Sequence, residues 1–364
     1  MKHVDEYRSS ELCRQVVNEI HQSATRCHTI MEVCGGQTHG LLMHGIDVAL
    51  AGVVDLLHGP GCPVCVTPAE DIDFAIALCR RPNVTVATFG DMLRVPGTTI
   101  SLREASSRGG NVRLVYSPLD AVQLARDDPA REYVFFAVGF ETTTPATALA
   151  AQQAAHLGLE NFSMIVSHVR VQPAMEAIMR SEASRVEAFL AAGHVCTVSG
   201  YDCYDQFASQ YRVPVVVTGF EPLDLLSGIL SCVRQLESGV AMVENRYERS
   251  VHAEGNRNAL QVIDELYEVC DRPWRGLGTL QGGGFRLRDR WSFFDAVHRY
   301  PRTALPTVQP SLCRSGDVLT GRIKPTDCEY FGRECTQELP LGAPMVSLEG
   351  ACAAYARHAR QTAS

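Results

Sequence analysis

The sequence has no apolar run that approaches the roughly 20 residues needed to span a bilayer. Its first 15 residues carry charges throughout and contain no apolar core of a signal peptide. It also has no surplus of positive charge, since 33 Lys and Arg face 41 Asp and Glu for a net charge of −8. These absences argue against a membrane protein and against a nucleic-acid binder that relies on neutralising phosphates. They predict a cytoplasmic protein.

What is present is typical of a globular chain. Hydrophobic residues make up 46% and charged residues 20% of the 364 residues. This composition allows a sizeable core, and the length predicts two or three domains.

Cysteine is the unusual component, with 14 residues, four of them between positions 313 and 352. Without an export signal, metal or redox chemistry is a better explanation than a disulfide framework. Seven cysteines lie within helical or strand patterns and are expected to be small buried hydrophobes, namely Cys13, Cys27, Cys79, Cys196, Cys203, Cys232 and Cys270.

Short apolar runs alternate with amphipathic stretches through the middle of the chain. The expected strands are Thr29–Val33, Val53–Leu57, Val84–Phe89, Val112–Tyr116, Tyr133–Val138, Ser163–Val169 and Val213–Thr218. The expected helices include Ala146–His156, Ala174–Ala192 and Leu223–Glu237. Apolar strands that alternate with helices indicate parallel sheets covered on both faces.

Seven strands are many for one such sheet and favour two α/β units. The segments Gly139-Phe140-Glu141-Thr142 and Gly219-Phe220-Glu221-Pro222 both follow a Val-rich strand, and either two similar units or chance would explain this three-residue match. We therefore predict an α/β fold with two similar parallel-sheet domains, 21–120 and 121–225. Beyond residue 240 the alternation of apolar strands with helices ends, and 240–269 is expected to be mostly helical. A third domain, 226–364, is expected to be helical, loop-rich and Cys-rich, and to be joined by residues 1–20.

The first candidate site is the Cys62-Pro-Val-Cys65 pair. Thr67 and Glu70 have the spacing of a capping box with Pro68 at the first helical position, so a helix should begin just after Cys65. Its positive end would favour the thiolate and a reactive pair. The alternative is a buried structural pair or half of a zinc site, although the chain has no second Cys-x-x-Cys.

The second candidate is Cys34 with His39, on a Gly-rich turn at the end of a predicted strand. Ligands of open α/β sheets bind at the carboxyl ends of strands, where Cys34, Cys62 and the 139–144 segment would meet. Thr144 and Pro145 fit the start of a helix, which would suit an anion. The alternative for these threonines is helix capping alone.

The third candidate is the tail, with Cys313, Cys328, Cys335 and Cys352. Their spacings of 15, 7 and 17 match neither a zinc ribbon nor the tight run of bacterial ferredoxins. Four thiols suit zinc or a four-iron cluster, so spacing leaves the metal open.

Taken together and in order, these motifs resemble the HypD family of hydrogenase maturation proteins. The resemblance rests on Cys-Gly-Gly-Gln-Thr-His at 34–39, Gly-Pro-Gly-Cys-Pro-Val-Cys at 59–65, Gly-Phe-Glu-Thr-Thr at 139–143, Gly-Phe-Glu-Pro-Leu-Asp at 219–224, Trp-Arg-Gly-Leu-Gly at 274–278, and the segments around Cys328, Cys335 and Cys352.

The resemblance implies a scaffold on which the iron of [NiFe]-hydrogenases acquires two cyanides and one carbon monoxide. A small HypC-type chaperone would share the iron and a HypE-type protein would deliver cyanide, with no nucleic-acid or membrane partner. Cys34, Cys62 and Cys65 would handle this iron, with His39 nearby. Cys313, Cys328, Cys335 and Cys352 would hold a [4Fe-4S] cluster.

We hypothesise that Cys62 and Cys65 cycle between disulfide and dithiol with electrons from the cluster, in a metallocentre-assembly scaffold with redox activity. One alternative is an iron–sulfur-fed thiol–disulfide oxidoreductase that acts on other proteins. Another is a zinc-stabilised interaction protein without catalytic activity.

Overall fold

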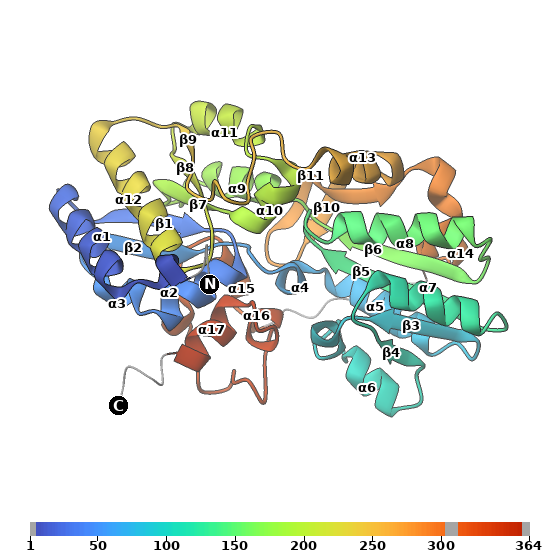
Figure 1. Ribbon diagram of the computed structural model, residues 1–364. Helices are drawn as coiled ribbons and strands as arrows, with labels where there is room; N and C mark the ends of the chain where they lie inside the picture. Colours follow the sequence, from blue (N-terminus) through green and yellow to red (C-terminus); the bar gives the residue numbers. More distant parts are fainter. Residues whose placement is uncertain (1–4, 303–311, 359–364) are drawn as a thin grey trace.

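The computed structural model describes residues 5–302 and 312–358, which form two sheet-containing halves (Figure 1). Sheet A has the strand order β2 (Val54–His58), β1 (His28–Glu32), β7 (Ala188–Ala192), β8 (Val215–Thr218) and β9 (Val243–Asn245). Sheet B has the order β4 (Val112–Leu114), β3 (Val84–Thr88), β5 (Glu132–Gly139) and β6 (Phe162–His168). All strand pairs in both sheets are parallel.

Helices cover both faces of sheet A. Successive residues of a strand point to opposite faces, so each strand contributes side chains to both layers of packing. Ile30, Leu190 and Val216 face α1 (Ser10–Ser23), α2 (Gly35–Met43) and α12 (Pro222–Ser238). Met31 and Phe189 face the other side, against α9 (Val171–Met179), α10 (Gly193–Ser199) and α11 (Cys203–Tyr211). Burial on both faces explains why these strands are continuous apolar runs.

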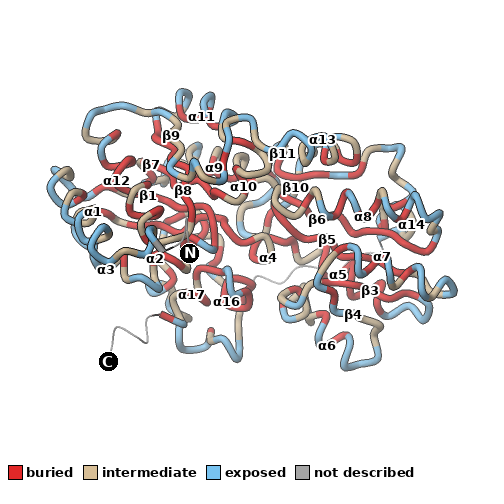
Figure 2. Tube along the Cα trace, viewed as in Figure 1, coloured by how far each residue is buried: buried red, intermediate tan, exposed pale blue. Residues whose placement is uncertain are grey.

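Sheet B is covered in the same way. One face packs on α5 (Ala69–Cys79) and α6 (Leu102–Ser107), and the other packs on α7 (Pro118–Asp127), α8 (Thr144–His156) and α13 (Arg257–Leu266). Figure 2 shows most strands of both halves as buried, together with the segment around α4 (Pro63–Val66) that runs between the halves, whereas β4 and β9 are intermediate or exposed.

The chain from residue 257 onward adds smaller elements. An antiparallel hairpin joins β10 (Tyr267–Trp274) to β11 (Gly278–Leu287). The tail lies beside α2 in the sheet A half (Figure 1) and contains α15 (Ser315–Leu319), η4 (Pro325–Asp327), α16 (Ala343–Val346) and α17 (Ala351–His358). Other short elements are η1 (Asp5–Arg8), α3 (Ile46–Ala49), η2 (Gly90–Leu93), η3 (Asp289–Phe294) and α14 (Ala296–Arg299).

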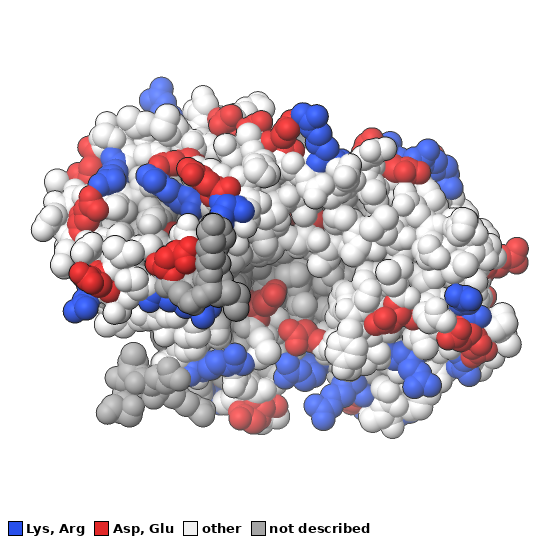
Figure 3. All heavy atoms as spheres, viewed as in Figure 1, with Lys and Arg blue, Asp and Glu red and all other residues white. Residues whose placement is uncertain are grey.

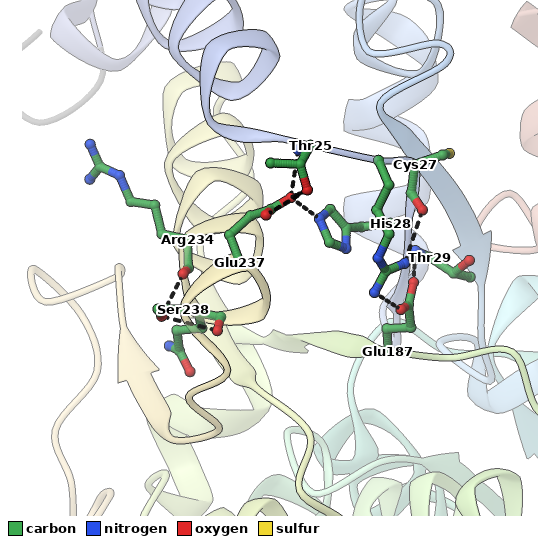
Figure 4. Close-up of polar contacts among 10 residues, drawn as sticks. Thr25, Cys27, His28, Thr29, Glu187, Arg234, Glu237 and Ser238 are labelled. Atoms are coloured by element: carbon green, nitrogen blue, oxygen red, sulfur yellow. Dashed lines mark hydrogen bonds and ion pairs between the residues drawn. The ribbon is translucent and has the colours of Figure 1, made fainter.

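Polar contacts fix the amino ends of the sheet A strands, opposite the end that carries Cys34 (Figure 4). Glu237, in the last turn of α12, accepts hydrogen bonds from the Thr25 amide and hydroxyl and contacts the His28 ring at 2.7 Å. These bonds lower the pKa of Glu237 to about 2. Glu187 accepts a hydrogen bond from the Thr29 amide and pairs with Arg26.

The α/β class and all seven predicted strands are confirmed. Two local expectations are wrong: β7 lies in the stretch 174–192 expected to be helical, and 240–269 contains β9 and the start of β10 besides a helix. Strand pairing also crosses the boundary expected at residue 120. Sheet A combines strands from 28–58 with strands from 188–245, whereas sheet B uses 84–168. Neither sheet therefore coincides with the expected segments 21–120 and 121–225.

On the face seen in Figure 3, acidic and basic side chains are interspersed, as the modest net charge suggests. Within the described part of the chain, no helix has the length and apolarity to cross a membrane.

Candidate functional site

The loops that follow the neighbouring strands β1 and β2 pack directly on each other. The amide of Gly35 donates to the carbonyl of Gly61 at 3.1 Å. A Cβ atom at Gly61 would lie only 2.4 Å from the Cα of Cys34. Because backbone cannot move aside as a side chain can, glycine at 61 is what lets the Cys-x-x-Cys loop close over Cys34.

Cys34 is the N-cap residue of α2, and its side chain is only 1% exposed. Its Sγ lies 3.5 Å from Nδ1 of His194, in the first turn of α10. The Phe220 ring contacts the His194 ring with centroids 5.3 Å apart, so the 219–224 motif supports the imidazole. Burial raises the pKa of the Cys34 thiol and lowers the pKa of His194, so both groups are neutral at pH 7.

His39 does not contact Cys34 in this structure. Its Nδ1 lies 3.4 Å from Nε2 of His358 on α17, and the two rings pack edge to face. The imidazole beside the thiol is therefore His194, which the sequence analysis missed. A usable signal was Gly193-His194 directly after the apolar run 188–192, had that run been interpreted as a strand.

Cys62 and Cys65 form a disulfide, and both are buried. Cys62 is the N-cap residue of α4, where its sulfur accepts a hydrogen bond from the Cys65 amide at 3.1 Å. The predicted capping box is wrong: Thr67 Oγ1 donates to the Pro63 carbonyl, and the longer helix α5 begins at Ala69 after Pro68. The pair thus lies in its own single turn of helix between β2 and α5.

Arg275 of the 274–278 motif fixes the end of this turn. Its amide donates to the Val66 carbonyl at 2.8 Å, and its guanidinium donates to the carbonyls of Thr67 and Pro96 at 2.9 and 2.8 Å. Helix α4 also packs on α16 of the tail. In this contact, Cys62 and Cys65 belong to the same apolar cluster as Ala343 and Val346. The disulfide is therefore in direct packing contact with the Cys-rich tail.

The four tail cysteines line one pocket. Its walls are otherwise largely apolar, with Val318, Tyr330, Phe331, Leu341 and Met345 alongside Cys313, Cys328, Cys335 and Cys352. Burial raises the pKa of Cys335 and of Cys352, and the neighbouring thiols contribute to both shifts. In the described ranges, no three His, Cys, Asp or Glu side chains close into a metal-binding group. The donor set, four thiols in an apolar pocket, nevertheless fits zinc or an iron–sulfur cluster.

The 139–144 segment contributes packing to this region. Phe140 belongs to the apolar cluster that contains Cys34 and Val66. The hydroxyls of Thr143 and Thr144 both bond the Phe140 carbonyl, and α8 begins at Thr144 with Thr143 as its N-cap residue. The expected capping role is therefore wrong: these hydroxyls bond the preceding backbone, no side-chain hydrogen bond caps α8, and the N-cap residue is Thr143 where the sequence predicts Thr144.

The fold and site together define a thiol-rich α/β protein with a buried Cys34–His194 pair, a disulfide and a pocket lined by four cysteines. Sequence comparison gives this class a family. Residues 11–359 match the family model HypD, described as "Hydrogenase formation hypA family". The chain belongs to this HypD family.

Similar proteins cover nearly the whole chain. The chain is 45% identical to the hydrogenase maturation factor HypD of Azotobacter vinelandii, with 99% of this chain and 98% of that protein covered. It is 44% identical to HypD of Rhodobacter capsulatus, with 98% and 97% covered. It is 42% identical to HypD of Escherichia coli strain K12, with 99% of each chain covered. These similarities support a role in hydrogenase maturation.

Proposed function

We propose that this protein is the scaffold on which the Fe(CN)2CO centre of [NiFe]-hydrogenases is assembled, with the iron held at Cys34. The observation that carries the proposal is the buried contact between the Cys34 thiol and the His194 imidazole, beneath the Cys-x-x-Cys loop. The family membership supports the maturation role itself.

The chemistry of the pair suits an iron cargo. A thiol becomes a good ligand only after it loses its proton, and thiolate is a soft donor suited to iron with strong-field ligands. Nδ1 of His194 lies 3.5 Å from the Cys34 sulfur, so the imidazole is placed to accept the thiol proton as the metal binds. Burial keeps water away from the thiolate that forms.

The Cys62–Cys65 disulfide supplies a redox function. Its reduction consumes two electrons and two protons and yields two thiols in the loop whose Gly61 packs on the Cys34 backbone. The four tail cysteines fit a [4Fe-4S] cluster, which when bound would supply electrons one at a time. The packing of α4 on α16 supports this assignment because it joins the disulfide segment to the tail.

Partners follow from the family. We propose that a HypC-type small chaperone shares the iron and that a HypE-type protein delivers cyanide, in the cytoplasm. The burial of Cys34 implies that the iron enters only when the loop at 59–65 or a docked partner opens a path to the thiol.

The test is an infrared spectrum of the protein purified without oxygen together with its small partner. Cyanide and carbon monoxide bound to iron absorb where proteins are silent. We expect bands in the wild type and in Cys232→Ala, which removes another buried cysteine on α12, and no bands in Cys34→Ala.

The absence of bands from wild-type protein that still shows iron–sulfur absorption would contradict the scaffold. It would favour the second candidate, an iron–sulfur-fed thiol–disulfide oxidoreductase, which the observed disulfide also fits. Zinc in place of iron would favour the zinc-stabilised interaction protein.

A further inference from the structure

A chain of hydrogen bonds runs from half-buried Tyr355 on the C-terminal helix α17, through buried side chains, to the backbone of Cys34. The Tyr355 hydroxyl on α17 lies 2.9 Å from Nε2 of His58, at the end of β2. Nδ1 of the same ring lies 2.8 Å from Oε1 of Glu32, at the end of β1. Oε2 of Glu32 accepts the amide hydrogen of Cys34 at 2.7 Å.

The sheet sets the centre of this chain. Glu32 and His58 are direct partners in the register of the parallel pair β1 and β2, so their side chains leave the same end of the sheet side by side. Glu32 is fully buried and His58 is 2% exposed. A buried carboxylate is costly unless several donors reach it, and here the Cys34 amide, the Thr38 hydroxyl and the His58 ring do so.

The contacts link these groups in sequence. The two oxygens of Glu32 accept from the Cys34 amide and the Thr38 hydroxyl, and Oε1 also contacts Nδ1 of His58. The opposite ring nitrogen, Nε2, contacts the Tyr355 hydroxyl. Each bond orients the next, so the position of Tyr355 constrains Glu32 and through it the first turn of α2.

The helix at the far end is the one that carries Cys352, one turn before Tyr355. The same helix reaches α2 a second time through His358 and His39. In addition, a Cβ at Gly35 would lie 2.3 Å from the Glu349 carbonyl oxygen, so the segment before α17 is pressed against the residue that follows Cys34.

We propose that Glu32, His58 and Tyr355 are positioning residues that couple occupancy of the four-cysteine pocket to the placement of Cys34. Ligation at Cys352 fixes α17, the Tyr355–His58–Glu32 chain transmits that position, and the Cys34 backbone is held ready for its metal. This inference rests on the proposed function, because it takes the tail cysteines as cluster ligands and Cys34 as the iron site.

The test measures the rate at which a maleimide labels Cys34, read by mass spectrometry of the peptide that contains it. Cluster-loaded and cluster-free protein are compared without oxygen. In the wild type, loading should slow labelling of this buried thiol. In Tyr355→Phe, which keeps the ring and removes only the hydroxyl, the effect of loading should shrink by about two- to tenfold, the range expected for one net hydrogen bond.

Tyr211→Phe is the matched control. It removes a hydroxyl that contacts Arg180 at 3.1 Å on the exposed side of α11, and it should retain the full effect of loading. His58→Asn keeps a donor near the Nδ1 position for Glu32 and loses the bond to Tyr355. The effect of loading on Cys34 labelling should therefore shrink as much in His58→Asn as in Tyr355→Phe. The double variant should show no greater reduction than either single variant.

The outcomes separate the two hypotheses. The positioning chain would be overturned if the loading effect were unchanged in Tyr355→Phe. It would also be overturned if the wild type labelled Cys34 at the same rate with and without the cluster. Failure of the proposed function would show differently, as a wild type without iron–sulfur absorption or without infrared bands. Additive losses in the double variant would mean that His58 and Tyr355 act separately, which also overturns the chain.

Discussion

A single methyl group at Gly61 should displace the candidate iron site. The Cβ of Gly61→Ala would lie 2.4 Å from both the Cα and the N of Cys34. Ordinary contacts of this kind begin near 3.4 Å, so the Cys-x-x-Cys loop and the Cys34 turn must separate by about 1 Å. Overpacking of this kind typically costs about 1–3 kcal/mol of folding free energy.

The displacement should cost more in function than in stability. A shift of about 1 Å in a reacting group lowers rates by roughly a hundredfold. We therefore expect Gly61→Ala to fold, to lose about 1–3 kcal/mol in urea unfolding, and to retain almost none of the infrared-active iron. Gly90→Ala is the control, because its Cβ meets only the Leu114 side chain at 3.4 Å. Normal stability together with normal infrared bands in Gly61→Ala would refute the close packing of the two loops.

Three further predictions follow from the described contacts. His194→Ala should weaken iron retention at Cys34 by about ten- to hundredfold, measured by iron analysis after dialysis, while iron–sulfur absorption stays intact. Cys328→Ala should abolish the visible iron–sulfur absorption that Cys270→Ala keeps, and an unchanged spectrum would exclude Cys328 as a ligand. Because folding lowers the pKa of Glu237 to about 2, its stabilisation is present above its ordinary pKa near 4.5 and is lost as the pH falls from there toward 2. Glu237→Gln should therefore show a shallower loss of stability in urea titrations over that range than the exposed control Glu254→Gln.

The sequence predicts the strands well but not their arrangement. Val-rich and Phe-rich runs between glycines identify buried parallel strands by composition alone. Strand β7 was missed because Ala-Phe-Leu-Ala-Ala suits a helix by propensity, and only its burial between β1 and β8 makes it a strand. Without β7, no pattern in the sequence predicts that the chain leaves sheet A after β2 and returns to it after β6.

The same limit applies to the candidate site. Cys34, Cys62 and Cys65 could be predicted to share one sheet edge because each follows a strand, and adjacent parallel strands end together. His194 and Glu32 could not. The histidine follows the strand that composition misassigned, and a lone glutamate in an apolar run shows no partner until the register places it opposite His58.

The topology explains why the disulfide lies where it does. The chain passes from sheet A to sheet B only once before residue 100, through α4 and α5 between β2 and β3. The Cys-x-x-Cys pair occupies the start of that crossover. Arg275, in the turn between β10 and β11, donates hydrogen bonds to the Val66 and Thr67 carbonyls at the end of α4. Any change of the pair between disulfide and dithiol therefore occurs where both sheets, the hairpin and the tail are in contact. A redox-dependent shift of one sheet against the other should consequently begin at α4, and hydrogen exchange of the Val66 and Thr67 amides in oxidised and reduced protein would detect it. Identical exchange in the two states would show that the pair changes its redox state without moving the crossover.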